Sequence, residues 1–382
     1  MINRQIIKSI KSLITKFPVL ALTGPRQSGK TTLLKNSFPE YRYISLEDLD
    51  YRNYALEDPK GFLEEYNYKV IFDEAQRVPH LFSYIQTIVD ESKKMGHFIL
   101  TGSQNFLLLE NITQSLAGRV ILFKLLPFDF TELKNEKILL SNWKEQAIKG
   151  FYPAIYDRDI NPSIYYANYI QTYIQRDVSQ LINIHDFTKF NNFIKLCAGR
   201  TAQLLNINHL AKDCGISPPT AKSWLSILEK SYIIFLLKPY YENFNKRVIK
   251  SPKLYFFDTG LVSYLLNIKK AKDISEHQKG HLFENLIVAE KEKQNQHQYL
   301  LYEYWFWRNS KGVEVDLLYK KGTKFVLYEI KSSKTIQSKM IKGLNYFDEL
   351  TQRKTKSKII IYAGDRNQKR THFKIERWNN IT

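Results

Sequence analysis

The chain has 382 residues, of which 43% are hydrophobic and 25% charged, so length and composition predict two or three ordinary folded domains. Lys and Arg number 57 against 38 Asp and Glu, and the net charge of +19 favours a polyanionic partner, unless it reflects only a general bias towards lysine. Two cysteines exclude a disulfide framework and a CxxC zinc site, and the lack of a long apolar run excludes a membrane-spanning helix. We therefore expect a cytoplasmic protein that makes no use of a membrane.

Residues 1–140 contain five short apolar runs separated by helical segments. The runs lie at 19–23, 41–45, 70–72, 98–100 and 120–123. Runs that are apolar on both faces and alternate with helices predict a parallel sheet covered on each side, which is an α/β fold. Ligands of such sheets bind beyond the carboxyl ends of the strands, so the polar residues that follow the runs are the candidate site.

A phosphate-binding loop follows the first run. Its sequence, GPRQSGKT, agrees with the pattern GxxxxGK[ST] at every fixed position. We expect Lys30 to reach the β- and γ-phosphates of a nucleotide, and the Thr31 hydroxyl to ligate Mg²⁺. The nucleotide-binding residues expected are Gly24, Pro25, Arg26, Gln27, Ser28, Gly29, Lys30, Thr31 and Thr32.

Two acidic residues follow the run at 70–72 and complete the expected metal site. Asp73 stands where a carboxylate can hold the Mg²⁺ of the nucleotide, and Glu74 where it can orient the hydrolytic water. No Asn-Lys-x-Asp guanine-reading motif is present, which favours ATP over GTP. The sequence thus predicts an ATPase that uses Mg²⁺.

Two further residues are candidates for the reaction itself. Ser103 follows the run at 98–100 and is expected between the two motifs, near the γ-phosphate, although Gln104 stands where a small residue is expected. Arg119 is expected to supply positive charge to the transition state, in the same chain or from a neighbouring subunit. The alternative for Arg119 is a surface arginine that caps the end of a helix.

With these motifs, the chain resembles a large bacterial and archaeal family of AAA+-type ATPases in which a restriction-endonuclease-like domain follows. The residues that carry the resemblance are 24–31, 73–74, 100–103, 115–119, 126–128, 173–177, 250–255 and 258–261. The resemblance covers nearly the whole chain and implies ATP binding, hydrolysis and a role linked to DNA. It also implies a homo-oligomer, as a ring or a smaller assembly, unless Arg119 acts within its own chain.

Residues 141–250 are expected to form a helical lid and a winged-helix domain. Within 210–225, Gly215 suits a left-handed turn, Ser217 an N-cap and Pro218 the first helical position, which is typical of a helix-turn-helix. Its outward DNA contacts would be Thr220, Lys222 and Ser223, and phosphates could be followed by Lys246, Arg247, Lys250 and Lys253. The alternatives are a packing or protein-contact unit with Trp224 in the core, and lysines that only solvate a hairpin.

Residues 251–382 contain strand-like runs at 300–307, 313–318, 325–330 and 358–362. Period two places Glu329 and Lys331 on one side of the third run, and Asp316 lies within reach on the preceding, antiparallel run. Upstream, Glu284 is a carboxylate on an otherwise apolar helix. Charged groups on buried elements need a partner or a metal ion.

This order of helix and strands, with Glu284, Asp316, Glu329 and Lys331, resembles the PD-(D/E)xK nuclease core. The resemblance implies that Asp316 and Glu329 hold Mg²⁺, that Lys331 positions or activates water, and that Glu284 supports the metal. The alternative is a salt-bridged pair in an inactive nuclease fold that serves as a scaffold. The leading hypothesis is an ATPase whose nucleotide state governs DNA engagement, and its rival is a nucleotide-controlled regulator that cuts nothing.

Overall fold

The first part of the chain folds around a five-stranded parallel sheet. In the computed structural model, which describes residues 2–102, 108, 112, 114–174, 187–241 and 250–381, the strand order is β2-β3-β4-β1-β5. The strands are β1 (Val19–Thr23), β2 (Arg42–Ser45), β3 (Val70–Asp73), β4 (Phe98–Thr101) and β5 (Val120–Lys124). The expected parallel sheet is therefore confirmed.

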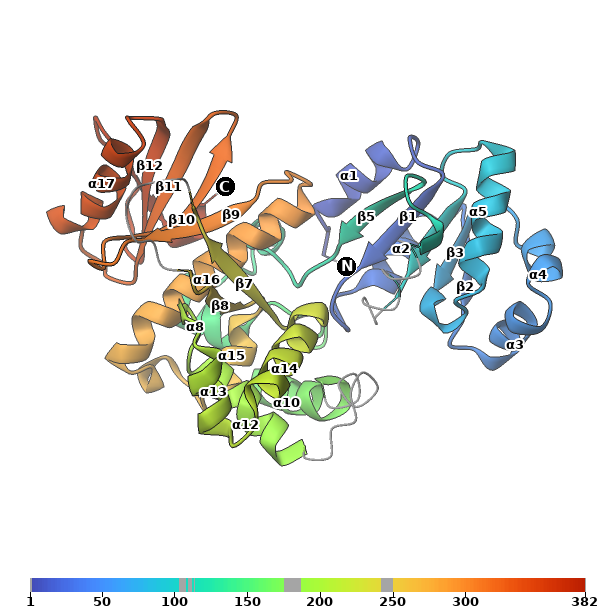
Figure 1. The fold of residues 1–382 in the computed structure, drawn as a ribbon, viewed down its shortest axis with the longest axis horizontal. Helices are drawn as coiled ribbons and strands as arrows, with labels where there is room; N and C mark the ends of the chain where they lie inside the picture. Colours follow the sequence, from blue (N-terminus) through green and yellow to red (C-terminus); the bar gives the residue numbers. More distant parts are fainter. Residues whose placement is uncertain are drawn as a thin grey trace.

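Helices cover both faces of this sheet because its side chains are apolar on each. Val19, Ala21 and Phe72 pack with one set of helices, and Leu20 and Leu22 pack with the other. The elements are α1 (Ile6–Leu13), α2 (Lys30–Ser37), α3 (Leu49–Glu57), α4 (Pro59–Glu65), η1 (Ala75–Arg77) and α5 (Leu81–Ser92). In Figure 1 this body, in blue to teal, forms the right-hand part of the molecule.

The middle of the chain is mainly helical and packs around one large apolar core. Its helices are α7 (Phe130–Asn135), α8 (Trp143–Lys149), α9 (Pro153–Asp157), α10 (Pro162–Tyr169), the π-helix η2 (Ile170–Ile174), α12 (Phe187–Ala198), α13 (Ile207–Cys214), α14 (Pro218–Lys230) and α15 (Thr259–Leu265). Three short strands accompany them: β6 (Gln203–Leu204), β7 (Ile234–Pro239) and β8 (Lys253–Phe256). β8 pairs antiparallel with both β6 and β7.

A second sheet of nine strands has the order β13-β14-β12-β11-β10-β9-β7-β8-β6. Its further strands are β9 (Tyr304–Arg308), β10 (Glu314–Lys321), β11 (Lys324–Lys331), β12 (Thr355–Tyr362), β13 (Gln368–Lys369) and β14 (Lys374–Arg377). The remaining helical turns are η3 (Ala271–Asp273), η4 (Ser338–Ile341), α17 (Lys342–Leu350) and η5 (Trp378–Asn380). Since β7 pairs with β9, the sheet continues across the boundary expected at residue 250.

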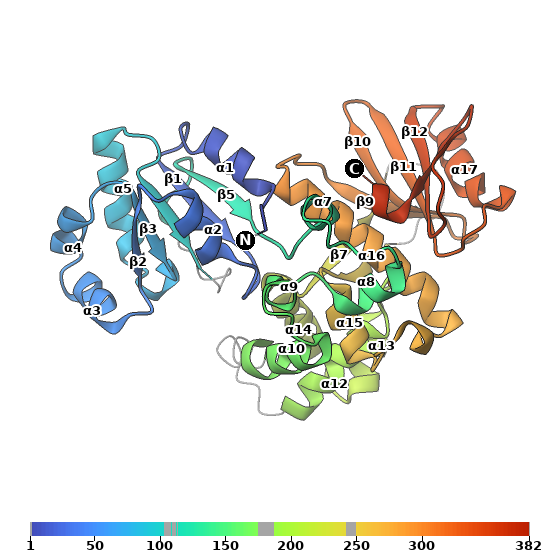
Figure 2. The same ribbon diagram turned by 180° about the vertical axis from the view of Figure 1, so that it is seen from behind.

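The helix α16 (Glu276–His297) connects the parts of the molecule. It is 22 residues long, begins at a capping box formed by Ser275 and Gln278, and contacts α1 and β5 as well as α8, α15, β8 and β11. Figures 1 and 2 show it, in orange, between the first sheet and the C-terminal strands. Residues in its two halves therefore contact different parts of the molecule. Glu284 and His297, for example, lie about 20 Å apart along the helix axis at a rise of 1.5 Å per residue.

Candidate functional site

The loop between β1 and α2 has a backbone that requires glycine at two points. Gly24 has a φ of 145°, and a Cβ at this position would overlap the carbonyl oxygen of Leu125. Gly29, with a φ of 93°, lies in the left-handed region immediately before α2. The loop thus turns tightly around the N-terminus of α2, where the first N–H groups and the helix dipole favour an anion.

Two side chains expected at the phosphates and metal are held by this loop. Lys30 is buried, and its ammonium donates hydrogen bonds to the carbonyl oxygens of Gly24 (2.9 Å) and Pro25 (3.0 Å). The Thr31 hydroxyl donates to Asp73 Oδ2 over 2.8 Å, which joins the loop to the end of β3. The structure therefore brings together the two residues expected to serve the Mg²⁺.

Tyr43 is a further partner of Asp73 that sequence reasoning missed. Its hydroxyl donates to Asp73 Oδ2 over 2.5 Å from the neighbouring strand β2, where Ser45 lies opposite Asp73. Burial and the hydrogen bond to Asp73 raise the pKa of Tyr43 above its usual value, so it stays a donor at neutral pH. No sequence signal indicates this contact, because strand order is a tertiary property.

The loop fits a nucleotide phosphate with its metal. Ser28 Oγ is buried and lacks a hydrogen-bond partner among the described residues, whereas buried hydroxyls normally have one. A phosphate oxygen would supply the missing acceptor, and hydroxyl and carboxylate oxygens such as those of Thr31 and Asp73 are ligands that Mg²⁺ prefers. Arg26 is half-buried and Gln27 exposed. A small cavity beside the loop is lined by Ile2, Arg4, Gly29, Thr32, Leu33, Phe128, Pro153 and Asp157.

Glu74 lies directly after Asp73, in the left-handed region with a φ of 56°. Its N–H donates to Asp73 Oδ1 (3.1 Å), and its Oε2 accepts a hydrogen bond from Gln76 Nε2 (2.6 Å). Gln76 Oε1, also buried, has no partner among the described residues and lies against Gly102, so any Cβ at Gly102 would overlap it. Gln76 thus holds the carboxylate that we expect to orient water, which makes it a second residue that the sequence did not reveal.

Arg4 ties the phosphate-binding loop to α7 and α16. Its side chain, 5% exposed, donates to the carbonyl oxygens of Ser28 (2.8 Å) and Leu126 (2.5 Å) and forms an ion pair with Glu132 (3.0 Å). Its Nη2 also lies 3.5 Å from His297 Nε2, at the end of α16. The loop backbone is therefore in contact, through one guanidinium, with the long helix that reaches the C-terminal part.

The hydrogen bonds around His297 define which of its ring nitrogens carries the proton. Nε2 accepts from the N–H of Leu126 (3.2 Å), so Nδ1 carries the proton that is donated to Asp129 Oδ2 (2.8 Å). Burial alone would raise the pKa of Asp129, but the hydrogen bond from His297 lowers it. Asp129 and Glu132 also form a capping box at the start of α7. These hydrogen bonds and ion pairs join the phosphate-binding loop, α7 and the end of α16. The buried groups that have partners in this way are Arg4, Asp129, Glu132 and His297.

A second cluster of charges lines a cavity of about 650 Å³ between α16 and the strands β8, β10 and β11. Ligand oxygens of Glu284, Glu314 and Asp316 all lie within 4.8 Å of one another. Lys331 Nζ lies 2.6 Å from Glu329 Oε1 and 3.2 Å from Asp316 Oδ2, with β10 and β11 antiparallel as expected. The structure thus brings together all four residues singled out from the sequence.

Glu314 is the carboxylate of this cluster that the sequence reasoning did not select. It stands two residues before Asp316 and on the same side of β10, so period two could have indicated it. Its two oxygens form ion pairs with Lys253 and Arg308, the latter at 3.2 Å. Lys253 is 3% exposed, so the expectation that it follows phosphates on the surface is wrong. It faces inward because β8 is a buried strand.

The environment of the cluster changes its proton affinities. Burial and the nearby charge of Asp316 raise the pKa of Glu329 to about 8. Burial also raises the pKa of Glu284, although Lys253 opposes it. The pKa of Asp316, in contrast, is lowered, because the charges of Lys331 and Lys253 outweigh its burial. At neutral pH the cluster therefore contains one carboxyl that binds its proton well and one that releases it readily.

Comparison with known proteins identifies the first of these two sites. Residues 16–134 match an AAA domain. The phosphate-binding loop therefore lies within an AAA-type domain. Residues 140–272 match a domain of unknown function (DUF8612), and residues 279–379 match another (DUF4143), so neither match assigns nuclease activity.

Relatives extend the similarity over most of the chain. An uncharacterized protein of Mycobacterium tuberculosis is 29% identical over 340 residues, which is 87% of this chain and 74% of the relative. Another, from Methanocaldococcus jannaschii, is 27% identical and covers 83% of this chain and 74% of its own. The Walker-type ATPase PABY2304 of Pyrococcus abyssi aligns at 15% identity and a TM-score of 0.41, covering 70% of this chain and 96% of its own.

Arg119 does not reach the loop of the AAA-type domain in its own chain. It precedes β5 and accepts a hydrogen bond from Val19, the first residue of β1, whereas the loop follows the last residue of β1. Its guanidinium pairs with Asp90 on α5 over 2.5 and 2.7 Å. The predicted role within the chain is therefore wrong, because Arg119 lies at the opposite end of the parallel strands. Ser103 lies outside the described residues.

The expected helix-turn-helix has the predicted local geometry. Gly215 is left-handed at a φ of 65°, and Ser217 caps α14 by accepting from the Thr220 N–H (3.2 Å). Lys222 and Ser223 are exposed, whereas Thr220 is half-buried. Trp224 is buried and packs edge-on against Phe190 and Phe193 of α12. Lys222 and Ser223 are thus available on the surface of α14, and Trp224 belongs to the core. Lys246 and Arg247 lie outside the described residues.

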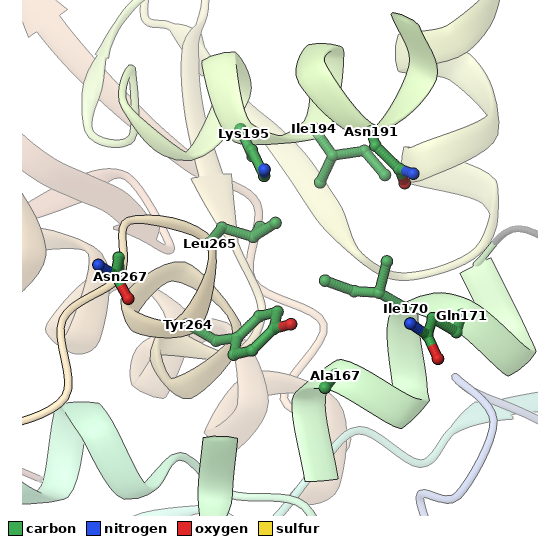
Figure 3. Close-up of a pocket in the computed structure, with 9 residues that line it drawn as sticks. All are labelled: Ala167, Ile170, Gln171, Asn191, Ile194, Lys195, Tyr264, Leu265 and Asn267. Carbon is green, nitrogen blue, oxygen red and sulfur yellow. The ribbon is translucent and has the colours of Figure 1, made fainter. Parts of the chain in front are cut away.

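Another cavity, of about 390 Å³, lies in the helical middle part (Figure 3). It is lined by Ala167, Ile170, Gln171, Asn191, Ile194, Lys195, Tyr264, Leu265 and Asn267. Within this lining, Lys195 is the charged residue and no carboxylate is present. The described part of the chain also has no helix of the length and apolarity that crossing a membrane requires.

Proposed function

We propose that this protein binds and hydrolyses ATP with Mg²⁺, and that the nucleotide state controls its contact with DNA. The observation that carries the ATPase part is the 2.8 Å hydrogen bond between Thr31 and Asp73, which aligns a hydroxyl and a carboxylate beside the phosphate-binding loop. A bound Mg²⁺ would supply charge neutralisation at the β- and γ-phosphates. The AAA domain match over residues 16–134 supports the same assignment.

The chain's own residues supply the remaining steps. Lys30 already donates to two loop carbonyls, so its ammonium is positioned to exchange these for phosphate oxygens. Glu74, held by Gln76, orients and deprotonates the attacking water. The apolar residues beside the loop, such as Phe128 and Pro153, offer a surface for the base. Arg119 and Ser103 remain candidates, the former only through a neighbouring subunit of a homo-oligomer.

Phosphate release by the full chain tests this proposal. Lys30→Ala should abolish Mg²⁺-dependent turnover, and Glu74→Gln should reduce it by about a hundredfold while leaving ATP binding measurable, because it removes only the base. Lys60→Ala is the matched control, since Lys60 is an exposed lysine on α4. Unchanged turnover in both Lys30→Ala and Glu74→Gln would refute the assignment of ATP hydrolysis.

For DNA, we propose that α14 and the adjoining strands act as a winged helix. The support is the order α12, β6, α13, α14, β7, β8, the exposed Lys222 and Ser223, and the net charge of +19. Lys222→Ala should weaken binding of duplex DNA and reduce its salt dependence, whereas Lys60→Ala should do neither. A protein-contact role is the alternative, and DNA affinity equal in both variants would favour it.

The C-terminal cavity supports the regulatory alternative over an active nuclease. Its carboxylates fit Mg²⁺ poorly, since Glu284 and Glu314 are paired with Lys253, and Asp316 and Glu329 with Lys331. Plasmid incubation with Mg²⁺ or Mn²⁺ should give no nicking; nicking that persists in Lys30→Ala and disappears in Asp316→Ala would overturn this assignment.

A further inference from the structure

The cavity between α16 and the second sheet contains an inward-facing lysine at the centre of its acidic groups. Lys253 Nζ lies 2.8 Å from Glu284 Oε1 and forms an ion pair with Glu314 Oε1. These oxygens belong to two of the three carboxylates whose ligand atoms lie within 4.8 Å of one another. An ammonium in contact with two such oxygens occupies the volume that a cation shared between them would need.

The surrounding contacts fix Lys253 in this place. Its side chain is 4% exposed, and burying a charged amine is costly unless it is paired and hydrogen-bonded. Tyr255, two residues along β8, donates to the same Glu284 Oε1 over 2.7 Å. One strand thus presents both an ammonium and a hydroxyl to the carboxylate of α16.

The charge around the cavity is nearly balanced without a metal ion. The carboxylates are Glu284, Glu314, Asp316 and Glu329, and the cations in contact with them are Lys253, Lys331 and Arg308. A divalent ion entering beside Lys253 would meet its ammonium at short range in a site of low dielectric constant, where like charges repel strongly. Removing Lys253 would remove both the steric block and this repulsion.

The other group of potential metal ligands among the described residues has the same arrangement of acidic and basic side chains. Asp129, Glu132 and His297 form it, and there Arg4 contacts Glu132 and His297. Both clusters use a side chain of α16, Glu284 in one and His297 in the other. In each, a basic side chain from another segment supplies the positive charge.

We propose that Lys253 is the resident cation of the cavity and excludes divalent metal ions from Glu284, Glu314 and Asp316. The cation comes from β8 in the middle of the chain, and the carboxylates come from α16 and β10. This inference does not depend on ATP hydrolysis, and it is tested without nucleotide.

The test measures Mn²⁺ binding to the full chain by electron paramagnetic resonance. All variants carry Asp73→Asn, which weakens metal binding at the nucleotide loop. The parent protein should show no Mn²⁺ site that depends on Asp316. Lys253→Met should gain one site per chain, at least about tenfold tighter than any in the parent, and Lys253→Met/Asp316→Asn should lose it. Lys60→Met is the matched control and should gain none, because Lys60 is an exposed lysine on α4 and Lys253 remains in place.

Two results would overturn the proposal. One is a folded Lys253→Met protein, checked by circular dichroism, that gains no Mn²⁺ site. The other is a parent site that disappears in Asp316→Asn, which decides the question even if Lys253→Met does not fold. Failure of the ATPase proposal, by contrast, would leave each of these measurements unchanged.

Discussion

Replacing Arg4 by methionine is the most informative perturbation of the AAA-type domain. Methionine keeps much of the apolar stem but removes the guanidinium. Three partners then lose a donor: the Ser28 carbonyl in the phosphate-binding loop, the Leu126 carbonyl and the carboxylate of Glu132. Glu132 has no exposed surface, so water cannot replace the lost charge.

The expected loss is about 4 kcal/mol of the free energy of unfolding. Breaking a buried ion pair by removing one partner costs roughly 3–5 kcal/mol, because the remaining charge stays buried and uncompensated. Glu132 keeps hydrogen bonds from the N–H groups of Gln5 (2.9 Å) and Asp129 (3.1 Å), which argues for the middle of that range. Arg42→Met provides the control, since the Arg42–Glu65 pair is about half exposed and should cost below about 1 kcal/mol.

Urea denaturation followed by circular dichroism, together with binding of a fluorescent ATP analogue, measures both consequences. Arg4→Met should unfold at lower urea and bind nucleotide more weakly, because Ser28 loses its tether. Adding Glu132→Gln to Arg4→Met should recover at least about 1 kcal/mol, since the unpaired charge is removed. An Arg4→Met loss no larger than that of Arg42→Met, or no recovery in the double variant, would refute this reasoning.

Three further outcomes are expected. Thr31→Ala should lower Mg²⁺-dependent ATP turnover about tenfold or more, equivalent to about 1.4 kcal/mol, whereas Thr87→Ala, at an exposed threonine of α5, should stay within about twofold in the same phosphate-release assay. Burial raises the pKa of Glu290 to about 8, so the unfolded state binds fewer protons and stability should fall as pH rises from about 5 to above 8. Glu290→Gln should remove a few kcal/mol of that pH dependence, measured as the free energy of unfolding from denaturation curves at several pH values. The same pH dependence in the parent protein and in Glu290→Gln would contradict the raised pKa of Glu290. Asp258→Ala should lower the free energy of unfolding by about 3 kcal/mol, since its carboxylate caps α15 and accepts from Tyr166 and Phe151; a change below about 1 kcal/mol would contradict this.

The local features of the nucleotide site could be predicted because each is encoded within a short segment. The pattern of residues 24–31 specifies a tight glycine turn followed by a helix, and the five apolar runs specify strands buried on both faces. The same holds for Gly215 and Ser217, whose conformations follow from the residue types themselves.

Contacts between distant segments could not be predicted in this way. Arg4 gave no signal, because its partners lie 24, 122 and 128 residues away. The sequence predicts Arg119 near the phosphates, yet the parallel strands return it to the opposite edge of the sheet. The basic neighbours of Lys253 in the sequence predict a surface lysine, whereas the buried strand β8 turns it inward.

The sequence by itself determined the phosphate-binding loop, the strands that support it and the turn geometry of the helix-turn-helix, since these depend on interactions between residues close along the chain. Only the tertiary structure decided which charges are paired. The direction in which Lys253 points depends on β8 being covered by α16 and followed in the sheet by β7 and β9. A buried charge is stabilised or destabilised by whatever lies within a few ångströms, and that is set by packing between segments far apart in the sequence.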